Sequence, residues 1–170
     1  MHIERKARTV PERIEREILI DAPREVVWSI ITEPRHVAGW FGDSAEIALR
    51  PGGAGAFTWN KGGADRGEGG EYGTRHARVE QVDPPRTFAF RWARELGAEP
   101  TPGASTLVEF HLTPVGEGTL LRVIESGFRE LEWPEEDNVR YVEGNREGWE
   151  LELGQLRDYV AEQVRGTSTS

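Results

Sequence analysis

The sequence predicts an α+β fold in which one antiparallel sheet packs against a single long helix near the C-terminus. From about residue 45 to 127, segments of strand character follow one another with only turns or loops between them. Strands joined by short turns pair antiparallel, because parallel neighbours would need long crossovers. Residues 138–164 then repeat apolar side chains at spacings of three, four and seven, as an amphipathic helix does. Such a helix must bury its apolar stripe, and the sheet is the large surface available for it.

Two short helices are predicted before the sheet, after a first strand that ends at residue 20. Asp21 is expected to cap a helix whose first turn contains Pro23. Thr32 or Glu33 is expected to precede a second helix that starts at Pro34, since proline needs no hydrogen-bond donor at a helix start. The predicted order is therefore strand, helix, helix, sheet and long helix.

The predicted strands of the meander are 45–49, 54–59, 71–82, 86–93, 105–113 and 119–127. Gly52-Gly53 and Gly116-Glu117-Gly118 suit tight turns between neighbours. Residues 60–70 contain five glycines and are expected to form a loop, and Pro100 and Pro102 make 94–104 a second one.

The length of 170 residues predicts one domain with a sizeable core, over residues 12–165. Residues 1–11 are expected to be a flexible arm and residues 166–170 a disordered tail, because neither carries an apolar pattern. The formal charge of −9 argues against binding to nucleic acid. The absence of cysteine excludes disulfides and a thiol nucleophile, and it fits a reducing cytoplasm. No segment has the pattern of a secretory signal or a membrane span, so no membrane insertion is expected.

The chain resembles the START-like (SRPBCC, birch-pollen-allergen-like) superfamily, and within it the family of the C-terminal domain of the heat-shock protein 90 ATPase activator. The resemblance rests on residues 21–41, Pro84-Pro85, Phe90-Arg91-Trp92, residues 125–128 and Gly148-Trp149. It extends over roughly residues 12–164 and implies the helix-grip fold, in which a curved antiparallel sheet holds the long helix. It also implies an internal cavity between the sheet and that helix.

Aromatic side chains dominate the segments that the resemblance places around this cavity. Many of them are expected either to line it or simply to form core, whereas Trp28, Phe110 and Leu153 are expected to be core. The candidate ligand-pocket residues are Trp40, Phe41, Phe57, Trp59, His76, Phe90, Trp92, Glu125, Phe128, Tyr141, Asn145 and Trp149.

The strand period places Glu125 on the inner face, two residues beyond Val123. A carboxylate there needs a partner. Arg75, His76 and Arg91 are the expected ones, and a bulge would decide whether Arg75 or His76 faces inward. Glu125 is either part of a structural ion pair at the rim or a ligand contact, and it is the single candidate for a catalytic role.

Other chemistries leave no trace in the sequence. There is no phosphate-binding Gly-Lys-Ser or Gly-Lys-Thr and no Gly-x-Ser-x-Gly, and the four histidines are scattered, so no cofactor and no metal are expected. Residues 129–152 hold nine acidic side chains against three arginines, which predicts a solvated face or, alternatively, a surface for a partner.

The resemblance implies a module that binds a small hydrophobic or amphipathic molecule. One alternative is an enzyme of the polyketide cyclase or dehydratase type, with Glu125 and either His76 or Arg91 as its acid/base pair. Another is a cofactor of a chaperone, by analogy with the activator. A homodimer is also considered, since a sheet of this kind has exposed edges.

Overall fold

A computed structural model describes residues 10–59 and 73–168 and confirms the predicted α+β, helix-grip arrangement. Its sheet has seven antiparallel strands in the order β1-β7-β6-β5-β4-β3-β2. The elements are β1 (Arg13–Ile20), α1 (Arg24–Thr32), α2 (Pro34–Trp40), β2 (Ser44–Ile47), β3 (Ala54–Trp59), β4 (Gly73–Asp83), β5 (Thr87–Ala93), β6 (Ser105–Val115), β7 (Gly118–Ser126), the 3₁₀ turn η3 (Phe128–Glu130) and α3 (Glu135–Ser168).

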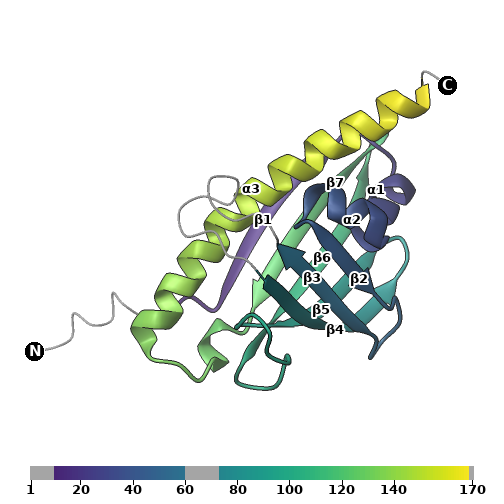
Figure 1. Cartoon of the computed structure of the whole chain (residues 1–170). Helices are drawn as coiled ribbons and strands as arrows, with labels where there is room; N and C mark the ends of the chain where they lie inside the picture. Colours follow the sequence, from purple (N-terminus) through teal and green to yellow (C-terminus); the bar gives the residue numbers. More distant parts are fainter. Residues whose placement is uncertain (1–9, 60–72, 169–170) are drawn as a thin grey trace, which may run out of the picture.

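The long helix α3 runs the length of the molecule beside β1, and α1 and α2 lie near its C-terminal half (Figure 1). Contacts join α2 to both β2 and α3, so the two short helices close one end of the space between α3 and the sheet. No described helix is long and apolar enough to cross a bilayer.

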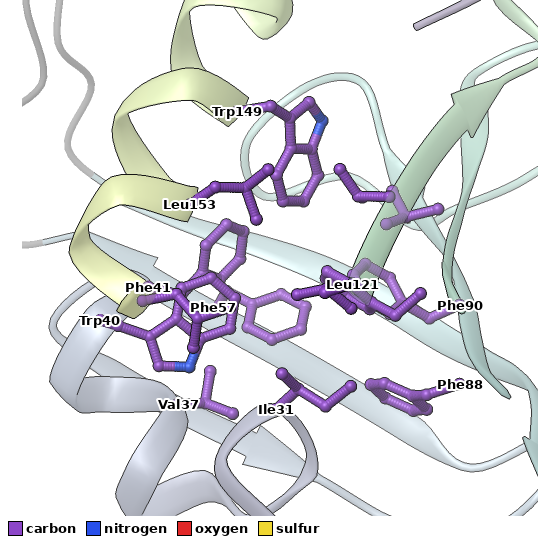
Figure 2. Packing of buried hydrophobic residues seen from close by; sticks show 14 of the residues in the cluster. Ile31, Val37, Trp40, Phe41, Phe57, Phe88, Phe90, Leu121, Trp149 and Leu153 are labelled. Atoms are coloured by element: carbon purple, nitrogen blue, oxygen red, sulfur yellow. The ribbon is translucent and has the colours of Figure 1, made fainter. Parts of the chain in front are cut away.

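The core lies between α3 and the inner face of the sheet, as the two periodicities predict. On β5, Phe88, Phe90 and Trp92 alternate inward and are buried. On α3, the buried side chains include Trp149 and Leu153, which project from the helix toward Phe41 in Figure 2. Burial of this apolar surface is the main force that holds the helix on the sheet.

The predicted start of the first helix is too early by two residues. The N-cap position is occupied by Pro23 in extended backbone, without a side-chain cap, and Arg24 is the first helical residue. Asp21 is not the cap, because the chain first makes a tight turn in which the Ala22 N–H donates to the carbonyl of Ile20. The second helix begins as predicted, with Glu33 at the N-cap and Pro34 in the first turn.

The ends of the domain also differ from the prediction. Val10, assigned to the flexible arm, is buried in the core, and its carbonyl accepts a hydrogen bond of 2.7 Å from Nε of Arg129. The helix α3 starts at Glu135 and continues to Ser168, into the expected tail. Three acidic residues in its first turn, 135–137, favour the earlier start through the helix dipole. The glycine-rich segment 60–70 and the first two residues of the predicted strand 71–82 lie outside the described residues.

Candidate functional site

The carboxylate of Glu125 lies fully buried between β7 and α3 and accepts hydrogen bonds from four side chains. Oε2 accepts from the indole N–H of Trp92 at 2.9 Å and from the hydroxyl of Thr106 at 2.6 Å. Oε1 accepts from the indole N–H of Trp149 at 2.9 Å, and Nδ2 of Asn145 donates to both oxygens at 3.0 Å. We call these five residues the Glu125 cluster.

The sheet register explains how the cluster forms. Trp92 of β5 pairs directly with Thr106 of β6, so both side chains point to the same face. Glu125 of β7 pairs with Val108, two residues further along β6, and therefore shares that face. The other two donors, Asn145 and Trp149, come from α3. They are four residues apart and so lie on one side of the helix.

The inward position of Glu125 was predicted correctly, but its expected charged partners were not. Its four donors are neutral groups, and the carboxylate is not a rim residue, because its exposed fraction is 0%. Thr106 was missed by the sequence argument. Its only signal was its place opposite Trp92 in the predicted hairpin.

The position of Arg75 and His76 on β4 resolves the alternative left open by the sequence. Arg75 pairs with Phe57 and is buried on the inner face, whereas His76 pairs with Ala56 on the opposite face. The prediction that His76 lines the pocket is therefore wrong. Arg91 also lies on the opposite face, where Nη1 donates to Oγ of Ser105 at 3.4 Å, so neither residue reaches Glu125 as an acid/base partner.

A second polar group surrounds Tyr141 on the first turns of α3. Nη1 of Arg75 donates to the Tyr141 hydroxyl at 3.1 Å, and its guanidinium carbon lies 4.5 Å from the centre of the Trp92 ring. The guanidinium of Arg94 lies 3.3 Å from the Trp133 ring centre and 4.6 Å from that of Tyr141. Burial raises the pKa of Tyr141, although Arg75 opposes the shift, so the phenol keeps its proton at neutral pH. Burial likewise lowers the pKa of Arg94.

The aromatic candidates form one continuous cluster beside these polar groups. Phe41 packs against Trp59, Trp92 and Trp149, and Phe57 packs against Phe90. All of these rings are buried.

Trp40 and Phe128 are the two candidates that remain. Trp40 contacts Phe41 and donates its indole N–H to the carbonyl of Ile30 at 3.1 Å. Phe128, on η3, packs edge-on against Tyr141.

The arrangement is suited to holding groups in place. Each of the four described donors around Glu125 already donates a hydrogen bond to its carboxylate, and the Glu125 side chain has no contact with solvent. A group so enclosed cannot exchange a proton with a bound molecule unless the cluster opens. Among residues 10–59 and 73–168, no three His, Asp or Glu side chains are grouped so that they could hold a metal ion.

Comparison with known proteins agrees with the architecture. The family model described as Activator of Hsp90 ATPase homolog 1-like protein matches residues 21–161. No curated protein matches the sequence significantly.

Many solved structures share the fold. Protein MLL2253 from Mesorhizobium loti is 24% identical, with a TM-score of 0.68 over 88% of this chain and 97% of that one. DynU16, from the dynemicin biosynthetic locus, is 24% identical, with a TM-score of 0.67 over 89% of this chain but 48% of its own. The Aha1 dimer from Colwellia psychrerythraea is 20% identical, with a TM-score of 0.66 over 87% of this chain and 95% of that one. Identities this low establish a shared fold only.

Proposed function

Since the chain belongs to the family of Activator of Hsp90 ATPase homolog 1-like proteins, we propose that it binds a small apolar or amphipathic molecule between α3 and the sheet. The observation that carries the proposal is the Glu125 cluster, a group of fixed polar side chains set inside an interior otherwise built of aromatic rings. Sites for small molecules have this composition, with mostly apolar walls and a few oriented polar groups.

The walls and the polar end have separate roles in this proposal. Phe57 and Trp92 supply apolar surface from the sheet, Phe41 supplies it from the end of α2, and Trp149 supplies it from α3. Tyr141 and Asn145 are partly exposed and lie on the same side of α3 as Trp149, so they are placed to meet the polar end of a ligand. Glu125 orients the two indoles and Asn145 without itself touching the ligand.

To test the proposal, bound molecules are first removed from the protein with organic solvent. The stripped protein is then titrated with octanol, decanol and dodecanol, and calorimetry measures the binding. We expect saturable binding of one molecule per chain, with about 0.8 kcal/mol gained per added CH₂ until the chain no longer fits. Native mass spectrometry before stripping would show whether a molecule co-purifies. Binding that does not saturate, or that grows without a limit on chain length, would indicate adsorption to the surface and would reject the proposal.

The enzymatic alternative has less support. A cyclase or dehydratase would need an acid/base pair, and the two residues expected to assist Glu125, His76 and Arg91, lie on the other face of the sheet. One observation favours an enzyme, namely that DynU16 comes from a biosynthetic locus, and activity assays would test this alternative. A chaperone partner has no described side-chain feature in its favour beyond the family's description.

We also propose that the chain forms a homodimer. The support is the related Aha1 structure, which is a dimer, together with the two edge strands β1 and β2 of the described sheet. Sedimentation velocity over a range of concentrations would distinguish a dimer from a monomer.

A further inference from the structure

One ring, Phe41, covers both indoles of the Glu125 cluster. Its centroid lies 5.7 Å from that of Trp92 at an interplanar angle of 18°, and 5.6 Å from that of Trp149 at 11°. The two indoles are themselves 5.9 Å apart and inclined by 25°. The three rings are therefore nearly parallel, and the indoles present aligned flat faces to a third ring.

Glu125 holds this alignment independently of Phe41. The two indole N–H groups donate to different oxygens of the same carboxylate, each at 2.9 Å. A carboxylate is planar and rigid, so the two bonds fix where both indole edges lie. Removing the third ring would leave the pair of indoles in place.

Phe41 is also the one ring of this group that lies outside the sheet and α3. Among described rings that contact Trp92 or Trp149, the others lie on β3, β5, β6 or α3, whereas Phe41 follows the last residue of α2. The next residue, Gly42, has a φ of +78°, a conformation that glycine adopts without strain. The N–H of Phe41 donates to the carbonyl of Val37 at 2.7 Å and the N–H of Asp43 to that of Thr58 at 2.8 Å, so Gly42 lies between two hydrogen-bonded residues.

We propose that Phe41 occupies the place of a planar aromatic ligand, and that such a molecule binds by displacing this ring and stacking on Trp92 and Trp149. This inference rests on the proposed function and specifies the class of molecule that the site takes. A fused aromatic molecule reproduces the offset stacking that Phe41 makes, whereas a saturated ring system of the same size cannot. The Glu125 cluster then serves as the rigid support of the stacking surface.

The test compares naphthol with decahydronaphthol, its saturated counterpart, on the wild-type protein. We expect naphthol to bind about tenfold more tightly, which corresponds to about 1.4 kcal/mol. In NMR spectra of the same samples, naphthol should shift the indole N–H signals of Trp92 and Trp149 by its ring current, and the signal of Trp133, which packs against Arg94, should stay in place.

Two matched variants test the displacement itself. Phe41→Ala removes the covering ring and should strengthen naphthol binding about tenfold. Phe110→Ala removes a ring that is equally buried but meets Trp149 edge-on, at 82°, and it should leave the affinity nearly unchanged. An equal gain in both variants would mean that any new cavity accepts naphthol, and it would overturn the inference.

The outcomes separate this inference from the proposed function. If the alkanols bind but naphthol is not preferred over decahydronaphthol, or the two indole signals do not move, the inference fails while the proposed function stands. If the alkanols do not bind either, both fail. The wild-type comparison decides the question even if Phe41→Ala does not fold.

Discussion

Trp149 donates its indole N–H to Oε1 of Glu125 at 2.9 Å, and this hydrogen bond joins the long helix to β7 of the sheet inside the apolar core. Trp92 makes the equivalent bond from the sheet to the other oxygen. A buried carboxylate is costly unless its lone pairs are occupied, and here every donor comes from a well-fixed element. The Glu125 side chain therefore links the two layers.

Glu125→Gln should lower the free energy of unfolding by about 1–3 kcal/mol. In the variant an amide N–H₂ replaces one of the two carboxylate oxygens, so a donor faces the side-chain donors that this oxygen accepted from. Whichever way the new amide turns, either Trp92 and Thr106 or Trp149 loses an acceptor. Urea denaturation measures the change. The matched control is Glu117→Gln in the exposed β6–β7 turn, which should leave stability unchanged. Equal stability of the two variants would mean that the buried hydrogen bonds contribute little.

Trp149 should show two separable contributions to stability. Trp149→Ala removes a ring that is 3% exposed and should cost about 3–5 kcal/mol. Trp149→Phe keeps most of the apolar contact but loses the N–H, and it should cost about 1–3 kcal/mol. In the Glu125→Gln background, Trp149→Phe should lower the free energy of unfolding by less than in the wild type, because the hydrogen bond from Trp149 to residue 125 is already weakened. Strict additivity in this double-mutant cycle would contradict the direct coupling of the two side chains.

Strand and helix periodicity predicted the order of the elements and the faces that they bury, since both depend on residues that are close in the chain. Alternation correctly placed Phe90, Trp92 and Glu125 on the inner face. It failed for His76 because β4 has a register irregularity between Val79 and Gln81, and such a shift by one residue exchanges the two faces of the strand. The hydrogen-bond donors of Glu125 were beyond reach for another reason. Thr106 and Asn145 come from separate elements, and only the folded register brings them to one carboxylate.

Gly39 and Gly144 predict opposite effects of the same substitution. A Cβ at Gly39 on α2 would collide with the ring of Tyr159 on α3, so Gly39→Ala should destabilise the protein by about 1–3 kcal/mol. A Cβ at Gly144, within α3, meets nothing within 4 Å. Gly144→Ala should therefore stabilise the helix by up to about 1 kcal/mol. Thermal unfolding gives both signs.

Relief of the collision provides the control for Gly39. In a Tyr159→Ala background, Gly39→Ala should lose most of its cost, because the ring that the new methyl group meets is absent. A cost that persists would place the effect in α2 itself rather than in its packing against α3.

His36 predicts a pH dependence of stability at this same α2–α3 contact. Its Nδ1 lies 2.8 Å from the Tyr159 hydroxyl, and burial lowers the pKa of the imidazole, with Arg35 adding to the shift and Glu33 opposing it. In the unfolded chain the imidazole takes up a proton near pH 6.5, whereas in the folded chain it does so only at lower pH. Between these values the unfolded state binds more protons, so the contribution of His36 is complete above about pH 6.5 and is lost as the pH falls below it.

The difference in unfolding free energy between wild type and His36→Gln should therefore be constant above neutral pH and decrease under acid conditions, as urea titrations at a series of pH values would show. A difference that instead grows as the pH falls would mean that the folded protein stabilises the imidazolium, which is incompatible with the buried position of the ring.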